Sequence, residues 1–108
     1  MPDQQTPAQK LVGDISPKLA QLTDDVLFGD VWERCGLAKR DRSLATIAAL
    51  ITLRASEQLQ AHIRIGLNNG LTQTEITELI THMAFYTGWP AAMNAIPLAR
   101  KAFAEHQQ

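Results

Sequence analysis

The sequence predicts an all-α fold. Apolar residues recur at helical spacing in successive segments, and no segment alternates between apolar and polar residues as a half-buried strand does. Helix start and stop signals separate these segments. With 108 residues, 45% of them hydrophobic, the chain has the length of one domain and the composition of a globular protein. We expect residues 1–10 to form a flexible arm and residues 11–108 to form the domain.

The first predicted helix begins at Ser16-Pro17, where a capping hydroxyl precedes a residue that needs no N–H partner. Its apolar stripe consists of Leu19, Leu22 and Val26. The helix is expected to end near Phe28-Gly29, and Arg34-Cys35-Gly36 is expected to form a turn. The second helix should follow Asp41 and Ser43 and continue to about Leu53.

The second helix is apolar on nearly all sides. Only Thr46 and Thr52 are polar between Leu44 and Leu53. A helix of this kind is buried on more than one side, which a small domain achieves with difficulty alone. The pattern therefore predicts that another subunit covers part of this helix.

The third helix is expected to begin with Ser56 as its cap and to end at Asn69-Gly70 in a left-handed turn. Its inward stripe consists of Leu59, His62, Ile63, Gly66 and Leu67. The fourth helix should begin with a capping box formed by Thr72 and Glu75. Its stripe consists of Ile76, Leu79, Ile80, Met83 and Thr87, and Phe85 lies on the opposite side, where a large aromatic side chain favours a partner surface.

The last helix should run from Pro90 to about Glu105, after a break at Gly88-Trp89-Pro90. Small residues line it, namely Ala91, Ala92, Ala95, Ala99 and Ala102. Pro97 lies inside it and should kink it, because proline removes a backbone hydrogen bond.

Composition excludes several classes of function. The net charge is −1, and no block of basic residues indicates binding to nucleic acid. No apolar run is long enough to cross a membrane, and residues 1–10 lack a signal-peptide pattern. A single cysteine, Cys35, allows no intrachain disulfide, so we expect a cytoplasmic location.

Three segments carry a family resemblance: FGDVWERCGLAKRDRSL (residues 28–44), EQLQAHIRIGLNNGLTQTEI (57–76) and THMAFYTGWPAAMNA (81–95). In this order and spacing, they resemble the carboxymuconolactone decarboxylase family of alkylhydroperoxidase D-like helical proteins. The resemblance implies a central antiparallel helix hairpin and a homo-oligomer, either a trimer or a hexamer. It also implies chemistry without a metal or cofactor.

One branch of this family, similar to alkylhydroperoxidase D, uses two cysteines four residues ahead of a histidine. With that histidine at His62, the cysteine positions are Ala55 and Gln58, and the branch's relay glutamate falls near Ser43. Disulfide cycling needs two thiols within exchange distance. Cys35 has no such partner in the sequence, so we expect no thiol peroxidase activity.

The other branch resembles 4-carboxymuconolactone decarboxylases, which serve the degradation of aromatic compounds. This resemblance implies a carboxy-lyase acting on a small carboxylated lactone. The chain departs from the expected pattern at Cys35, Ala38, His82, Met83 and Trp89. These departures favour an alternative, in which the chain is an oligomeric family member without peroxidase activity that binds or transforms another small acid.

Decarboxylation requires cations that hold carboxylates and a group that delivers a proton. His62 is the candidate proton carrier, because an imidazole titrates near neutral pH. We expect Gly66, one turn later, to leave space beside its ring. The alternative is a core histidine whose hydrogen bonds are satisfied.

His82 and Tyr86 are four residues apart and share a helix face, and Trp89 follows them. They form either one wall of a substrate pocket, with His82 as a second catalytic candidate, or a subunit interface. Arg42 and Glu57 are candidate substrate-binding residues. Alternatively, these two form an ion pair that bridges the starts of the second and third helices. No metal is expected, since the histidines show no spacing typical of zinc ligands.

Overall fold

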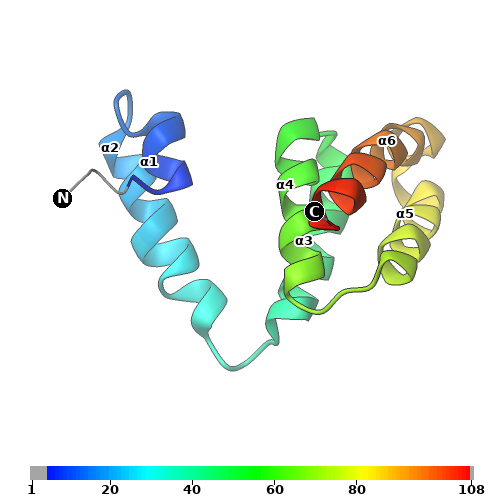
Figure 1. Ribbon diagram of the computed structural model, residues 1–108, viewed down its shortest axis with the longest axis horizontal. Helices are drawn as coiled ribbons and strands as arrows, with labels where there is room; N and C mark the ends of the chain where they lie inside the picture. Colours follow the sequence, from blue (N-terminus) through cyan, green and yellow to red (C-terminus); the bar gives the residue numbers. More distant parts are fainter. Residues whose placement is uncertain (1–4, 108) are drawn as a thin grey trace. The chain divides into compact units, whose positions relative to one another are not determined.

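The computed structural model describes residues 5–107, and within this range the chain forms helices and no strand (Figure 1). Its contacts divide it into two compact units, one ending at Leu37 and one beginning at Ala38. The expected all-α fold is therefore confirmed. The boundary between the two units lies well beyond the one expected at residue 11.

The first unit begins with a helix where a flexible arm was expected. Helix α1 spans Pro7–Val12, and Thr6 caps it. The Thr6 hydroxyl accepts from the N–H of Gln9, and the Gln9 amide oxygen accepts from the N–H of Thr6, so a complete capping box satisfies both donors. Residues 7–10 of the expected arm are therefore helical, whereas the flexibility of the arm stays a prediction, and residues 1–4 lie outside the described range.

The rest of the first unit follows the predicted order. Helix α2 (Pro17–Gln21) begins at the expected Ser16 cap, and the chain continues as a π-helical segment, η1 (Leu22–Phe28), and a short 3₁₀ helix, η2 (Val31–Glu33). Only Ala20 and Trp32 are buried among the described residues of this unit. The predicted stripe is therefore exposed rather than buried, with Leu19 51% exposed.

In the second unit, α3 (Lys39–Leu53) and α4 (Ser56–Asn68) pack against each other as an antiparallel hairpin (Figure 1). Helix α3 begins a few residues earlier than predicted, after Ala38. Ser56 is the first residue of α4 and not its cap, since Ala55 occupies the cap position and makes no side-chain bond there. The buried face of α3 contains Ser43, Ile47 and Ile51.

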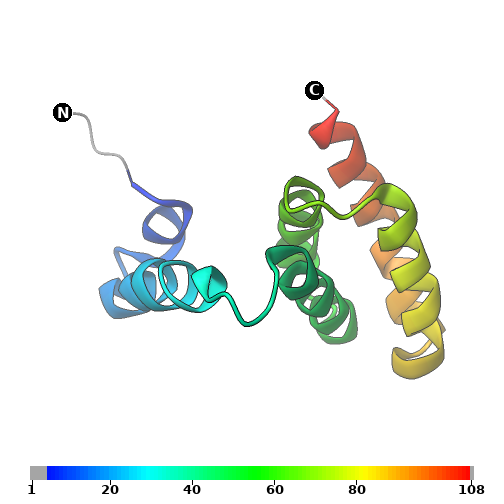
Figure 2. The same cartoon turned by 90° about the horizontal axis from the view of Figure 1, so that it is seen from below.

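Helices α5 (Gln73–Thr87) and α6 (Trp89–His106) form a second hairpin, which Figure 2 shows side by side. Helix α4 ends as predicted, because Gly70 at φ +106° lets the N–H of Leu71 reach the carbonyl of Gly66. The Thr72–Glu75 capping box is also confirmed. The predicted alanines of α6 are all buried and bring its backbone close to its neighbours. Pro97 lies inside α6, and the kink there stays a prediction.

The surroundings of Gly66 differ from the expected open space beside His62. A Cβ at this position would lie 3.0 Å from Leu71 Cδ1, 3.1 Å from Ile47 Cδ1 and 3.5 Å from Ser43 Cβ. The missing side chain therefore lets α3 and α4 pack closely. It does not open a space beside His62. Separately, no helix within residues 5–107 is both long and apolar enough to traverse a bilayer.

Candidate functional site

A cleft of about 450 Å³ lies between α3 and α5 in the second unit. Both apolar and charged side chains line it. The lining residues are Arg40, Leu44, Thr74, Glu75, Glu78, Leu79 and His82. Arg40 comes from the first turn of α3 and Glu75 from the first turn of α5, while Glu78, Leu79 and His82 follow later along α5. The cleft thus combines an apolar surface with groups capable of binding and of proton transfer.

An ion pair joins the two helices at this cleft. The Arg40 guanidinium donates to Glu75 Oε2 and also lies 3.3 Å from Asp41 Oδ1. The other oxygen of Glu75 accepts from the N–H of Thr72 at 3.0 Å. These hydrogen bonds, first from the Thr72 backbone and then from Arg40, lower the pKa of Glu75, while Glu75 raises the pKa of Arg40. Both groups are therefore charged at neutral pH, and their ion pair connects the first turn of α3 with the first turn of α5.

His82 and Tyr86 meet as predicted. Their ring centroids are 4.8 Å apart and their planes are inclined by 36°. Glu78 lies one turn before His82, so α5 presents a carboxylate, an imidazole and a phenol at successive turns. The first two groups line the cleft, and Tyr86 extends this edge into solvent, with 75% of its surface exposed.

His62 lies elsewhere in the bundle. Helix α4 packs against α3 and α6, and His62 is not among the residues that line the α3–α5 cleft. Its side chain is half-buried, and its Nδ1 atom is shielded from solvent. Burial lowers the pKa of His62 below its ordinary value of 6.5, so the imidazole is neutral at neutral pH. The expected pocket containing both His62 and His82 does not match this cleft.

Arg42 and Glu57 lie at opposite ends of the α3–α4 hairpin. The amide of Asn69, at the end of α4, donates to the hydroxyl of Ser43, beside Arg42, at 3.0 Å. Glu57 is in the first turn of α4 and is thus about 18 Å away along the helix axis. The alternative of an Arg42–Glu57 ion pair is therefore wrong, because antiparallel helices place their starts apart. Their roles in substrate binding stay predictions.

Trp89 turns toward a different neighbour than expected. Its ring packs edge-on against Phe85, with centroids 5.4 Å apart and planes inclined by 80°. Both side chains are more than half exposed. This contact favours the interface alternative for Trp89, whereas Tyr86 remains with His82.

Several residues that line the cleft were not predicted as site residues from the sequence. Arg40 and Glu75 are 35 positions apart, and Glu75 was recognised only as a capping residue. The four-residue spacing of Glu78 and His82 was the one local signal for a polar face on α5. Arg64 forms an exposed ion pair with Glu105 at 3.3 Å, which links α4 to α6.

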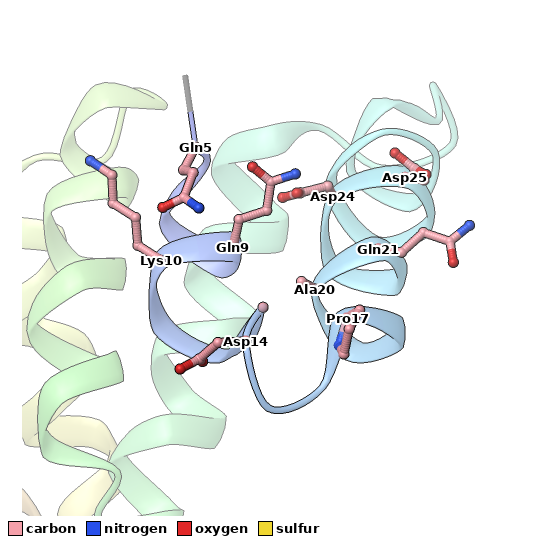
Figure 3. A pocket seen from close by; sticks show the side chains of 10 residues that line it. Gln5, Gln9, Lys10, Asp14, Pro17, Ala20, Gln21, Asp24 and Asp25 are labelled. Atoms are coloured by element: carbon pink, nitrogen blue, oxygen red, sulfur yellow. The ribbon is translucent and has the colours of Figure 1, made fainter. Parts of the chain in front are cut away.

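A second hollow, of about 740 Å³, lies within the first unit between α1, α2 and η1 (Figure 3). Asp14, Asp24, Asp25 and Lys10 are among its lining residues, together with glutamine amides, and the hydroxyl of Thr6 donates to Asp24 at 2.7 Å. Its lining contains no imidazole or guanidinium group. Among residues 5–107, no set of three or more His, Cys, Asp or Glu side chains is placed to hold a metal ion. The absence of a metal from the site stays a prediction.

The helical fold and the sequence agree with one protein family. The model of the carboxymuconolactone decarboxylase family matches residues 17–101, which is most of the chain. The protein therefore belongs to the carboxymuconolactone decarboxylase family.

Curated relatives carry related names. The chain is 43% identical over 76 residues to 4-carboxymuconolactone decarboxylase of Acinetobacter baylyi, a match covering 70% of this chain and 57% of that protein. It is 37% identical over 81 residues to nitrosuccinic acid decarboxylase of Metarhizium robertsii, covering 75% and 57%. It is 34% identical over 103 residues to an uncharacterised 15.0 kDa protein of Paracoccus denitrificans, covering 93% and 73%. The chain thus spans little more than half the length of the two decarboxylases.

Proposed function

We propose that this protein is a cofactor-independent carboxy-lyase that acts on a small carboxylated lactone, in the degradation of aromatic compounds in the cytoplasm. The observation that carries the proposal is the 43% identity to a protein named 4-carboxymuconolactone decarboxylase, within a family match over residues 17–101. A second relative is named for a decarboxylation of a different small acid, which supports loss of carbon dioxide as the common chemistry.

In this proposal His62 carries the proton. The C–CO₂⁻ bond breaks, carbon dioxide leaves, and the bonding electron pair is delocalised onto the lactone carbonyl as an enolate. A proton then goes to carbon. Burial lowers the pKa of His62, so the imidazole is neutral before substrate binds. An anionic substrate beside His62 favours the protonated imidazolium. Substrate binding therefore promotes protonation of His62, which then donates this proton to carbon.

Binding of the carboxylates requires cations. Arg42, in the first turns of α3, is the proposed anchor, because a guanidinium binds a carboxylate through two parallel hydrogen bonds. Glu57 is proposed only as a separate substrate-binding candidate, because it lies about 18 Å from Arg42 along the helix axis and cannot contact the same small molecule within one chain. His82, which lines the α3–α5 cleft, is the proposed alternative proton carrier, and Tyr86 beside it is then the proposed wall of that separate site. Arg40 binds Glu75 and Asp41 at the rim of the α3–α5 cleft.

The alternative substrate is a different small acid. The nitrosuccinic acid decarboxylase relative favours it, as do the departures at His82 and Trp89. The test is release of carbon dioxide by the purified protein from 4-carboxymuconolactone and, in parallel, from nitrosuccinic acid. Release from the lactone supports the main proposal, and release from nitrosuccinic acid alone supports the alternative. No release from either acid above a buffer control contradicts both.

We also propose that the protein works as a homo-oligomer, a trimer or a hexamer. Large apolar side chains are exposed in the second unit, including Leu53 at 72% and Phe85 at 73%. Exposed apolar residues in this number are typical of a surface that another subunit covers. A mass in solution equal to the 11.9 kDa of one chain at micromolar concentration would rule the assembly out.

A further inference from the structure

An Asn-Gly pair occupies the turn that joins α4 to α5 (Figure 1). Asn69 directly follows the last residue of α4, and Gly70 is exposed with a φ of +106°. The other asparagines of the chain, Asn68 and Asn94, are followed by asparagine and alanine. Only Asn69 is followed by a residue without a side chain. The backbone nitrogen of Gly70 is therefore less hindered than the nitrogen that follows either of the other asparagines.

The amide side chain of asparagine reacts with the backbone nitrogen of the next residue. At this turn, the Gly70 nitrogen attacks Asn69 Cγ. The new C–N bond closes a cyclic imide, the bond from Cγ to the side-chain nitrogen breaks, and ammonia leaves with the proton of the Gly70 nitrogen. Water then opens the imide at either carbonyl and gives aspartate or isoaspartate. Water is the sole co-reactant, and asparagine is for this reason a thermolabile residue.

The folded backbone holds the two reacting atoms apart. Asn69 has a ψ of +5°, so the Gly70 nitrogen is nearly eclipsed with the Asn69 backbone nitrogen. Closure of the imide requires the Gly70 nitrogen to be nearly eclipsed with Asn69 Cβ instead. The Gly70 N–H also donates to the carbonyl of Leu67 at 3.2 Å, which holds this nitrogen in place. The reaction therefore requires local opening of the turn.

A buried hydroxyl holds the Asn69 side chain. Asn69 Nδ2 donates to Ser43 Oγ at 3.0 Å. Ser43 is fully buried and belongs to α3, so the bond ties the amide to a helix outside the turn. The same amide nitrogen has to leave as ammonia. The bond to Ser43 must therefore break before Asn69 Cγ approaches the Gly70 nitrogen.

We propose that Asn69 is a deamidation site and that the Ser43 hydroxyl limits the rate of this reaction in the folded protein. The inference depends neither on the proposed decarboxylation nor on the proposed assembly. It assigns a chemical role to the Asn69–Ser43 hydrogen bond, which joins residues 26 positions apart in the sequence.

Either product weakens the end of α4. Aspartate places a negative charge at the carboxyl end of the helix, where the peptide dipoles already present a partial negative charge. Its carboxylate also has no N–H to donate to Ser43. Isoaspartate lengthens the backbone by one atom where the N–H of Leu71 reaches the carbonyl of Gly66 at 2.9 Å. The deamidated protein should therefore unfold at a lower urea concentration.

The test follows deamidation in wild type, Ser43→Ala and Thr46→Val, each incubated folded and in guanidinium chloride at one pH and temperature. Peptide mapping by tandem mass spectrometry measures the conversion of each asparagine. Thr46→Val is the matched control, because it removes a hydroxyl of α3 that donates to the carbonyl of Arg42 and not to Asn69. Circular dichroism verifies the helix content of the folded samples.

In guanidinium chloride, Asn69 should deamidate at the same rate in all three proteins and faster than Asn68 or Asn94. In the folded wild type, the reaction at Asn69 should be slower than in the unfolded chain. Folded Ser43→Ala should react about 5-fold faster than the folded wild type, the factor that corresponds to one net hydrogen bond. Folded Thr46→Val should react at the wild-type rate. Asn69→Asp should lower the urea midpoint.

An unfolded chain in which Asn69 reacts no faster than Asn68 and Asn94 overturns the assignment of the site. A folded wild type that reacts as fast as the unfolded chain overturns the protection by the fold, and this comparison needs no variant. Folded Ser43→Ala that reacts no faster than Thr46→Val overturns the role of the hydroxyl. A wild-type urea midpoint in Asn69→Asp overturns the effect of aspartate on α4.

Discussion

Substitution of Gly66 by alanine tests how closely α3 and α4 approach. The added Cβ would lie 3.0 Å from Leu71 Cδ1 and 3.1 Å from Ile47 Cδ1. Both methyl groups belong to a fully packed core and must move by a few tenths of an ångström. Overpacking of this kind costs about 1–3 kcal/mol. Alanine regains about 1 kcal/mol of helix propensity over glycine. The free energy of unfolding should therefore fall by about 1 kcal/mol.

Two other glycines provide controls for Gly66→Ala in urea unfolding followed by circular dichroism. A Cβ at Gly36 meets nothing within 4 Å, so Gly36→Ala should change the free energy of unfolding by less than about 0.5 kcal/mol. Gly70 also has open space but sits at φ +106°, so Gly70→Ala should cost about 1–2 kcal/mol through backbone strain alone. If Gly66→Ala instead stabilises the protein by about 1 kcal/mol, α3 and α4 do not pack closely there, and the space expected beside His62 exists.

Three further predictions concern titratable groups. Burial lowers the pKa of His62, so the unfolded chain binds more protons, and the free energy of unfolding should fall as pH drops below the ordinary value of 6.5. His62→Gln should flatten this dependence of the urea midpoint on pH, whereas His106→Gln should not. The pKa of Glu75 is also lowered, so its contribution is present above the ordinary value of 4.5 and should be lost as pH falls further; a slope unchanged in Glu75→Gln would contradict this. Hydroperoxide consumption with a dithiol reductant should stay at background and should be the same in Cys35→Ser; consumption lost on that substitution would refute the exclusion of peroxidase chemistry.

Features that depend on neighbours in the chain were predictable. The Thr72–Glu75 capping box and the turn at Gly70 need only a few residues each, and both formed as expected. The alanines of α6 follow helical spacing, which fixes the buried face once the helix exists. The capping box of Thr6 and Gln9 had the same kind of signal, but the polar composition of residues 1–10 led to the expectation of an arm.

Features that depend on how helices meet were not predictable from spacing. The Arg40–Glu75 ion pair joins residues on separate helices, and no local sequence pattern indicates it. Gly66 was correctly expected on the inward face, yet spacing cannot tell whether its missing side chain faces an opening or another helix. The Arg42–Glu57 ion pair could have been excluded in advance, because an antiparallel hairpin separates the starts of its two helices.

The most direct test of the proposed chemistry is the rate of carbon dioxide release from 4-carboxymuconolactone by three forms of the protein: wild type, His62→Gln and His106→Gln. Glutamine resembles the imidazole in size and polarity, but its amide does not titrate near neutral pH and therefore cannot transfer a proton to carbon. We predict release by the wild type, a similar rate with His106→Gln, and a loss of about 100-fold or more with His62→Gln, the usual contribution of general acid catalysis. Folded His62→Gln protein that releases carbon dioxide at the wild-type rate would contradict the assignment of His62 as the proton carrier.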